Sequence, residues 1–568
     1  MVNLRTALAA DIAGGAAAAG AAGALAVPEL AAADVTIERT DRESRGDYAS
    51  PIALRLAKHC GRPPMEIARV IADYMEKKDY VGRITVAAPG YLNFWLNPGW
   101  LTARLDNVVE EDIRAEFTLG SGRQVNLEYI SANPTGPLTL GNVRAAFSAD
   151  TLANVLAYVG YNVTREYYLN DAGRQVRVLG ESVLRRLLQA AGHTVSYSDE
   201  LYQGDYIQDL AAATAEYFTE VESRTFTPED LDDPAAITAV ATYAVQLVVA
   251  MIKRQVEEDL RISFDVWTSE AAMRENGSVE EAMDGLRQRG VVYKKGGAVY
   301  LQTTKFGDSD DRVLVKSDGE YAYIMPDIAY HRNKFERGYQ LIFTFVGADH
   351  QGHGPKLRAA MAALGYDVDR LHIMTAQWMR LVRKGLPVKL SKRRGEVVGP
   401  GELIGEVGYD AARFFMVQHA LTTHMDFDLD LAQERSERNP VYYVQYAYVR
   451  MQSILRQAKE RGVLTAVGEE MPLDDRPALT HTLELALLRH LYRFPEVVEE
   501  IAVSFVVHEL VYYANELAKA IHVFYRHVPV LAAEEPALVR GRLQLVLASR
   551  KVLGEVLDLL GISKPDIM

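Results

Sequence analysis

Two loops hold the residues whose types and spacing predict chemistry. The first, at 131–142, carries two prolines and two glycines between a strand expected at 124–130 and a helix expected to begin at about Gly141. Glycine lets a ligand approach the backbone, and the free N–H groups and positive dipole end of a helix start favour an anion. The loop therefore favours a nucleotide phosphate site, and an ordinary strand-to-helix turn is the alternative.

The second loop is basic. Between Leu381 and Gly395 the chain has six basic residues and no acidic one, although its formal net charge is −14. This run follows residues 376–381, which we interpret as a buried strand. A basic loop at the end of a strand is suited to neutralising the charge of a departing pyrophosphate. The alternative is a solvated surface, which is the usual role of a charge run.

The pair of loops resembles the H-x-G-H and K-M-S-K-S loops of class I aminoacyl-tRNA synthetases. Within that class the resemblance narrows to the arginyl-tRNA synthetases and covers nearly the whole chain. The motifs that carry it are GDYAS at 46–50, PGYLNF at 89–94, SANPT at 131–135, NDAG at 170–173, DIAYH at 327–331, GADH at 347–350, VGYDAARF at 407–414, NPVYYVQYA at 439–447 and LLGI at 559–562.

The resemblance implies that the two loops bind ATP and catalyse amino-acid activation. This chain has Thr139 and Asn142 where the family usually has two histidines; both donate hydrogen bonds, but neither is cationic. Leu390 replaces the usual methionine and conserves volume. The residues expected to act in catalysis are Thr139, Gly141, Asn142, Lys389, Ser391 and Lys392, and those expected to contact ATP are Pro137, Leu138, Thr139, Leu140, Gly141, Asn142, Lys389 and Lys392.

An arginine substrate would need an acidic pocket, because its guanidinium has five donors and stays cationic. By resemblance, the residues expected to hold arginine are Asp327, Tyr323 and Glu128 at the guanidinium, Asn133 and Ser131 at the α-amino and carboxylate end, and His350 in the place where relatives often carry Gln. For two of them a structural role is the alternative: Glu128 would be an acid at the edge of a strand, and Tyr323 a packed core aromatic.

The pattern along the chain predicts three domains that position these residues. Residues 1–107 are expected to form an α+β N-terminal additional domain, which by resemblance contacts tRNA. Residues 120–431 alternate strand-like and helix-like stretches, which predicts an α/β, Rossmann-type parallel sheet with a helical insertion at about 175–261. Residues 439–568 have helical periodicity, which predicts an all-α bundle, by resemblance the anticodon-binding domain. The strands expected in the sheet are 124–130, 162–168 and 341–347.

Composition narrows the class of protein. The chain has 568 residues, 49% hydrophobic and 24% charged, which is typical of a globular protein. Its single cysteine, Cys60, excludes intramolecular disulfides and a cysteine-based zinc site, and it fits a reducing cytoplasm. The net charge argues against broad nucleic-acid binding, but a tRNA partner needs only a local basic surface.

Two apolar features bear on localisation. We expect no transmembrane helix and no membrane partner, because we identify no run of ~18 apolar residues free of charge and glycine. The alanine-rich opening at 7–33 is expected to form a helix and not a secretory signal, because Asp11 and four glycines interrupt its apolar core.

The resemblance implies a cytoplasmic, monomeric arginyl-tRNA synthetase. It would form arginyl-adenylate from L-arginine and ATP with Mg²⁺, then transfer the arginyl group to the terminal adenosine of tRNA(Arg). No zinc, other metal site or organic cofactor is expected. One alternative is a catalytically weakened relative that binds arginine or tRNA as a sensor or assembly factor. Another is a different nucleotidyl-transferring enzyme, which would not need the C-terminal bundle. A cysteine-specific synthetase is disfavoured, because Cys60 alone cannot build its zinc site.

Overall fold

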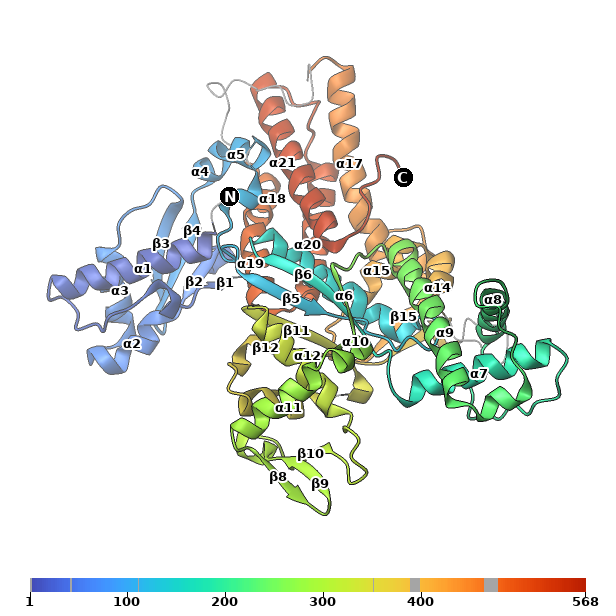
Figure 1. The fold of residues 1–568 in the computed structure, drawn as a ribbon. Helices are drawn as coiled ribbons and strands as arrows, with labels where there is room; N and C mark the ends of the chain where they lie inside the picture. Colours follow the sequence, from blue (N-terminus) through green and yellow to red (C-terminus); the bar gives the residue numbers. More distant parts are fainter. Residues whose placement is uncertain (1–2, 41–42, 111, 351, 389–398, 464–478) are drawn as a thin grey trace. The chain divides into compact units, whose positions relative to one another are not determined.

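The chain folds into two compact units. One comprises Leu119–Arg435, and the other joins Met1–Thr118 to Ser436–Met568. The N- and C-terminal regions, expected to be separate domains, therefore pack together as one unit. The computed structural model describes residues 3–40, 43–110, 112–350, 352–388, 399–463 and 479–568 (Figure 1).

The unit Leu119–Arg435 is built on a parallel sheet of five strands in the order β12-β11-β5-β6-β7 (Figure 1). Starting from β7, this is the order 3-2-1-4-5 of a doubly wound fold, in which ligands bind at the carboxyl ends of the strands where the winding reverses. That point lies between β5 and β11. The Rossmann-type fold expected from the sequence is confirmed. The strands are β5 (Gln124–Glu128), β6 (Asn162–Leu169), β7 (Val266–Ser269), β11 (Leu341–Gly347) and β12 (Leu371–Ala376).

Two insertions interrupt this sheet. The first, between β6 and β7, is helical, and the second, between β7 and β11, combines helices with a small antiparallel sheet of β8, β9 and β10. The first contains α7 (Arg174–Ala190), α8 (Tyr206–Glu220), α9 (Pro234–Arg254) and the π-helical turn η5 (Gln255–Asp259). The second contains α10 (Glu270–Glu275), α11 (Ser278–Gln288), β8 (Val292–Lys295), β9 (Ala298–Leu301), β10 (Arg312–Val315) and α12 (Ile324–Glu336).

Helix α9 bears on the expectation that the chain has no transmembrane helix. With η5 it spans Pro234–Asp259 and is long and apolar enough to cross a membrane by length and composition, because residues 234–252 contain neither charge nor glycine. One face of α9 is buried, and the helix packs against α7 and α8. This one-sided burial is the pattern of a helix packed on a folded domain. The buried residues are Ala236, Val240, Ala241, Ala244, Val245, Val248 and Ile252.

Helix α6 (Leu140–Tyr158) follows β5 and is anchored by a buried guanidinium. Arg144, only 1% exposed, donates hydrogen bonds to the backbone carbonyls of Gln377, Ala420 and Thr423, at 2.7 to 2.9 Å. A buried charge needs such partners to replace water. These bonds fix the start of α6, and so the end of the loop at 131–142, against the chain that follows β12.

The same anchor explains why the buried strand expected at 376–381 is wrong. β12 ends at Ala376, and β13 (Met379–Arg383) begins only after Gln377 has directed its carbonyl to the Arg144 guanidinium. The remaining elements of this unit are α13 (His353–Ala363), β14 (Leu386–Pro387), α14 (Pro400–Val407), α15 (Tyr409–Val417), β15 (Met425–Asp428) and α16 (Leu429–Gln433).

A second buried ionic contact joins α6 to the sheet. Asp150 accepts a hydrogen bond from Arg165 of β6 at 3.1 Å and from Arg413 of α15 at 2.6 Å. Arg413 is 1% exposed, and its guanidinium also lies over the Phe147 ring of α6. Three elements that are distant in the sequence are therefore held at one carboxylate.

We expect Arg413→Met to lower the free energy of unfolding by about 3 kcal/mol, the low end of the cost of breaking a buried pair, because Arg165 remains beside Asp150. Denaturant titration measures this value. Arg380→Met, in an exposed pair with Asp426, is the control and should leave stability nearly unchanged. Equal effects of the two variants would contradict the stabilising role of the buried contact.

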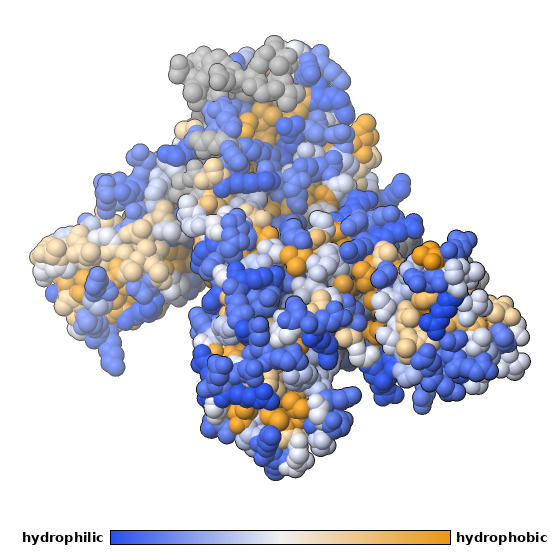
Figure 2. All heavy atoms as spheres, in the orientation of Figure 1, coloured by the Kyte–Doolittle hydropathy of each residue, from blue (hydrophilic) through white to orange (hydrophobic). Residues whose placement is uncertain are grey.

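The second unit begins with an antiparallel sheet in the order β1-β2-β4-β3, packed against helices. Helices α2 and α3 flank the proline-containing residues 61–64, and a strand covers 91–96. Figure 2 shows the surface of α1 in pale orange, because most of its exposed residues are alanines. The elements are α1 (Leu4–Ala21), β1 (Glu38–Arg39), β2 (Tyr48–Ser50), α2 (Ile52–Cys60), α3 (Pro64–Tyr74), β3 (Val81–Ala87), β4 (Tyr91–Leu96), α4 (Pro98–Ala103) and α5 (Leu105–Glu110).

The C-terminal segment of this unit is a helical bundle, as the periodicity predicted. A buried glutamate links it to the N-terminal sheet: Glu496 pairs with Arg39 of β1 and accepts a hydrogen bond from the hydroxyl of Tyr48 in β2 at 2.6 Å. This contact accounts for part of the union of the two terminal regions. The helices are α17 (Pro440–Glu460), α18 (Thr482–Tyr492), α19 (Phe494–Ser504), α20 (His508–His527) and α21 (Pro536–Leu560).

Candidate active site

A buried ion pair lies at the point where the winding of the sheet reverses. Glu128, the last residue of β5, is 5% exposed and lies opposite Thr344 of β11. Its Oε2 accepts hydrogen bonds from Lys334 Nζ at 2.6 Å and from Thr344 Oγ1 at 3.1 Å. Because a carboxylate removed from water needs such partners, Lys334 of α12 explains how Glu128 can be buried here. The interpretation of Glu128 as a simple edge-of-strand acid does not describe this environment.

The other oxygen of Glu128 fixes the turn that leaves the sheet. Ser131 Oγ donates to Glu128 Oε1 at 3.0 Å and accepts from the backbone N–H of Tyr168 at 3.2 Å. Ile130 and Ser131 have φ values of +67° and +38°, a left-handed conformation that residues with a side chain rarely adopt. Such backbone persists where its surroundings hold it. Ser131, predicted to bind the α-amino and carboxylate end of arginine, therefore also orients the loop at 131–142.

Asp327 lies in the first turn of α12, where it faces α13. Its Oδ2 is 3.0 Å from His353 Nε2, and the two side chains are 15% and 19% exposed. The Tyr323 ring meets the His353 ring edge-on, with 6.1 Å between ring centres. Tyr323 is 64% exposed, so it is not the packed core aromatic of the alternative interpretation. Asp327 and Tyr323 are thus placed at one surface-accessible edge of the site.

A third carboxylate, Glu270, was not singled out from the sequence. It lies at the start of α10, directly after β7, and is 6% exposed. It accepts a hydrogen bond from the Tyr168 hydroxyl at 3.0 Å and is paired with Arg274. Burial and the charges of Glu270, Asp327 and Glu128 raise the pKa of Tyr168. Three carboxylates therefore act on one tyrosine, which makes this region suited to a cationic ligand.

The helical insertion holds the loop at 131–142 at three points, one on each of α7, α8 and η5. The insertion therefore helps to fix the conformation of this loop. The bonds are Asn133 Nδ2 to Gln175 Oε1 at 2.6 Å, Tyr206 Oη to the Thr135 carbonyl at 2.8 Å, and the Leu138 N–H to Gln255 Oε1 at 2.9 Å.

Two loop residues have internal roles that the sequence did not indicate. The Leu138 side chain is 0% exposed and its N–H is bonded to Gln255, so neither can serve ATP in this arrangement. A Cβ on Gly136 would lie 2.9 Å from the Tyr206 hydroxyl, so any side chain there would require Tyr206 to shift. Gly141 is exposed and has only Thr139 Oγ1 near its would-be Cβ, at 3.4 Å.

Thr139 and Asn142 form a small unit at the start of α6. Asn142 Oδ1 accepts hydrogen bonds from the Thr139 N–H and the Thr139 hydroxyl, both at 3.0 Å. The amide oxygen is thereby fixed, and within the described residues no partner engages the Asn142 NH₂ group. Thr139 thus fixes the orientation of the Asn142 amide at the helix start. Pro137 and Leu140, also predicted to contact ATP, are half-buried beside them.

Four predicted residues cannot be placed in this geometry. His350 ends the short helix η7 (Ala348–His350), and its side chain lies outside the described part of the chain. Lys389, Ser391 and Lys392 also lie outside the described residues. The structure therefore brings together Glu128, Ser131, Tyr323 and Asp327 around one acidic region, and it places Thr139 and Asn142 at the neighbouring helix start.

Successive parts of the chain match three family models. Residues 4–96 match the arginyl tRNA synthetase N-terminal domain, residues 104–425 the catalytic domain of class I (R) tRNA synthetases, and residues 444–568 the DALR anticodon binding domain. Arginine–tRNA ligase of Geobacillus kaustophilus is 40% identical over 94% of both chains, and that of Moorella thermoacetica is 40% identical over 99% of this chain and 98% of its own. The chain belongs to the arginyl-tRNA synthetase family.

Solved structures of the arginyl-tRNA synthetase family share this fold. The Thermus thermophilus arginyl-tRNA synthetase aligns over 100% of both chains with a TM-score of 0.77 and 24% identity. The Plasmodium falciparum arginyl-tRNA synthetase aligns over 99% of both with a TM-score of 0.76 and 14% identity. At these identities the likeness concerns the fold alone. The family match confirms the predicted enzyme class, a ligase with a class I aminoacyl-tRNA synthetase catalytic domain.

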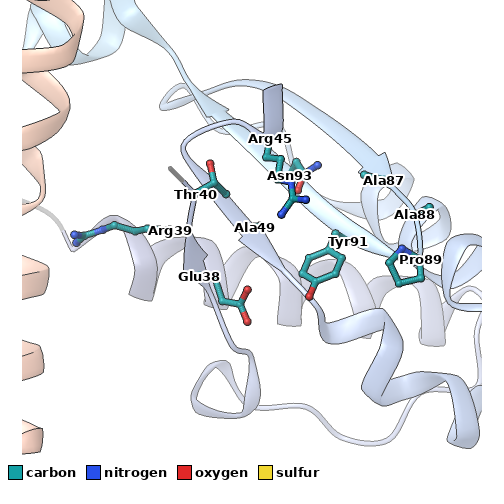
Figure 3. Close-up of a pocket in the computed structure, with 10 residues that line it drawn as sticks. All are labelled: Glu38, Arg39, Thr40, Arg45, Ala49, Ala87, Ala88, Pro89, Tyr91 and Asn93. Carbon is teal, nitrogen blue, oxygen red and sulfur yellow. The ribbon is translucent and has the colours of Figure 1, made fainter. Parts of the chain in front are cut away.

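The N-terminal domain of this arginyl-tRNA synthetase family member contains a pocket of about 490 Å³. Figure 3 shows the Tyr91 ring and the Arg45 guanidinium facing the same space, whereas the Arg39 guanidinium points away from it. Asn93, beside them on β4, is 4% exposed. A tyrosine face, an amide and a cation are the groups with which proteins bind unstacked bases.

No group of three or more His, Cys, Asp or Glu residues that could hold a metal ion occurs among the described residues. The carboxylates of the acidic region are instead paired with cationic side chains, Glu128 with Lys334 and Glu270 with Arg274. Lys334 could have been anticipated, because it lies seven residues after Asp327 and so on the same helix face. Glu270 could not, because the strand before it was not predicted.

We expect Asn142→Ala to lower the rate of amino-acid activation about 10-fold or more, the scale of losing one preorganised donor. Thr139→Ala should cost less, because it removes only the group that orients Asn142. ATP–pyrophosphate exchange in the presence of cognate tRNA measures both rates. If alanine at 139 and 142 together leaves the rate unchanged, these side chains do not contribute to catalysis.

Proposed function

We propose that this chain attaches L-arginine to tRNA(Arg) in two steps at the carboxyl ends of β5, β6 and β11. In the first step the arginine carboxylate attacks the α-phosphate of ATP, which gives arginyl-adenylate and pyrophosphate. In the second step a ribose hydroxyl of the terminal adenosine attacks the arginyl carbonyl, and AMP leaves. The chain's part in both steps is to position the reactants and to stabilise charge.

The distribution of charge among three carboxylates carries this proposal. Glu128 is paired with the ammonium group of Lys334, and Glu270 is paired with the guanidinium of Arg274. Asp327 instead faces the imidazole of His353 at 3.0 Å. Asp327 therefore has the negative charge most available to a guanidinium, which a carboxylate can bind through two parallel hydrogen bonds.

The other residues predicted to contact arginine are proposed to bind it around Asp327. Tyr323 lies at the exposed edge beside Asp327, and Glu128 and Ser131 lie at the end of β5. Asn133 is proposed to bind the α-amino and carboxylate end of arginine, for which its amide would leave its hydrogen bond to Gln175. By resemblance, His350 is proposed to contact arginine as well.

ATP is proposed to bind with its phosphates at the start of α6. The NH₂ group of Asn142 supplies neutral donors there, and the helix start adds free N–H groups and a positive dipole end. Lys389, Ser391 and Lys392 are proposed to neutralise the pyrophosphate, and Mg²⁺ to accompany ATP as part of the co-substrate. The backbone at Pro137, Leu140 and Gly141 completes the predicted ATP contacts.

For tRNA we propose two contact regions in the unit that joins the chain termini. The pocket at Tyr91 and Asn93 would receive an unstacked nucleotide, and the bundle at 439–568 would bind the anticodon stem and loop. We retain the boundaries 1–107 and 120–431, with the insertion at about 175–261, as proposed domain limits. The chain is proposed to act as a monomer in the cytoplasm.

The relatives are named arginine–tRNA ligases and match this chain over nearly their whole length, which favours an enzyme over a sensor or assembly factor. No observation on the described residues favours the sensor hypothesis.

We expect Asp327→Asn to lower kcat/KM for arginine about 30-fold or more, because it removes the charge opposite the guanidinium from a partly buried pair. The KM for ATP should change little. Charging kinetics with varied arginine and ATP measure both values. The control is Asp284→Asn, in an exposed pair with Arg287 on α11. Near-native arginine kinetics in Asp327→Asn would remove Asp327 from the pocket.

We expect arginine-dependent ATP–pyrophosphate exchange only when cognate tRNA is present. The reason is the resemblance to synthetases that complete their site on binding tRNA. Exchange is measured with purified tRNA(Arg), with a non-cognate tRNA and without RNA. Full exchange without RNA would show that the site is already assembled in the free protein.

A further inference from the structure

Lys334 is a buried lysine to which the proposed reaction gives no direct contact. Its side chain is 0% exposed, and its ammonium group lies 2.6 Å from Glu128 Oε2 and 3.2 Å from Thr344 Oγ1. The ammonium also lies 4.2 Å from the centre of the Tyr330 ring. Lysine is almost never fully buried unless it is paired. The site therefore contains a buried ammonium group paired with its first carboxylate.

The neighbouring His331 does not share this charge. Its Nδ1 donates to the backbone carbonyl of Asp327 at 2.9 Å, and its Nε2 lies 2.9 Å from Thr344 Oγ1. Burial and the nearby Lys334 ammonium hold the pKa of His331 well below its usual value, so the ring is neutral. Among the described residues, Lys334 is thus the cation that balances Glu128.

Glu128 transmits the position of Lys334 to the start of the loop at 131–142. One carboxylate oxygen is bonded to Lys334 and the other to Ser131, whose backbone has a φ of +38°. If the ammonium were absent, a buried carboxylate would take up a proton or turn toward water. Either change would release the Ser131 hydroxyl from its acceptor.

We propose that Lys334 is a positioning residue for arginine. It holds the Glu128 carboxylate in its orientation, and through Glu128 it holds the strained turn at Ser131. The inference rests on the proposed function, in which arginine binds beside these two residues. Lys334 itself touches no substrate, so its whole effect on arginine passes through Glu128.

The test is a double-mutant cycle of Lys334→Met and Glu128→Gln, with KM measured for arginine and for ATP in tRNA charging. We expect Lys334→Met to raise the KM for arginine about 10-fold or more and to leave the KM for ATP within about 2-fold. In the Glu128→Gln background, adding Lys334→Met should change the KM for arginine by less than about 2-fold, because the carboxylate to be positioned is gone.

A matched control is Lys316→Met, the same substitution in an exposed pair with Glu320. It should leave both KM values unchanged. Lys334→Met leaves an unpaired buried carboxylate and is expected to melt at a lower temperature, whereas the double variant removes both charges and should recover stability. If Lys334→Met does not fold, comparison of Glu128→Gln with the double variant still tests the inference.

The inference is overturned if Lys334→Met leaves the KM for arginine unchanged or lowers it. It is also overturned if Lys334→Met has as large an effect in the Glu128→Gln background as in the native chain, or if the KM for ATP rises equally. Failure of the native chain to charge tRNA with arginine would instead reject the proposed function. The two failures are therefore distinguishable.

Discussion

The buried carboxylates of Glu128 at the end of β5 and of Glu166 within β6 must meet cations, and residues at the carboxyl end of helix α12 supply them. Lys334 lies 2.6 Å from Glu128, and Arg337 lies 2.6 Å from Glu166. An uncompensated charge at such a site would cost several kcal/mol, so the two pairs specify where α12 must lie. Because α12 is fixed in this way at its carboxyl end, its first turn carries Asp327 to the edge of the same acidic region.

The remainder of the site follows from that placement. Asp327 faces His353, while Glu128 passes its orientation to Ser131 and so to the loop at 131–142. At the far end of that loop, Arg144 fixes the start of α6 through three backbone carbonyls. The acidic region and the helix start are therefore opposite ends of one supported segment. This arrangement suits a reaction that joins a cationic amino acid to a phosphate-bearing co-substrate.

Much of this arrangement was predictable from the sequence, because it depends on local pattern. The alternation of strand and helix predicted the parallel sheet, and the loop at 131–142 was placed correctly between a strand and a helix. The position of Lys334 on the same helix face as Asp327 was also predictable, since the two residues are seven positions apart. The family resemblance added the arginine chemistry that no spacing could supply.

The parts that the sequence did not predict depend on contacts between distant residues. Gly136 was predicted only as a loop glycine, whereas the structure shows that a side chain there would collide with Tyr206 of the helical insertion. The long apolar helix at 234–252 was not predicted, because polar residues interrupt the apolar pattern there without adding charge. The union of the two termini depends on contacts such as Arg39 with Glu496, which no local pattern contains. The roles predicted for Lys389 and Lys392 stay predictions.

The central claim is that an acidic site on this sheet selects arginine for attachment to tRNA. The most direct measurement is aminoacylation of total tRNA by the purified full-length chain, with ATP and Mg²⁺, using each of the twenty amino acids in turn. The account predicts that label from arginine alone accumulates in acid-precipitable RNA. Charging with a different amino acid, or the absence of ATP-dependent charging with any of the twenty, would contradict the selection of arginine by this site.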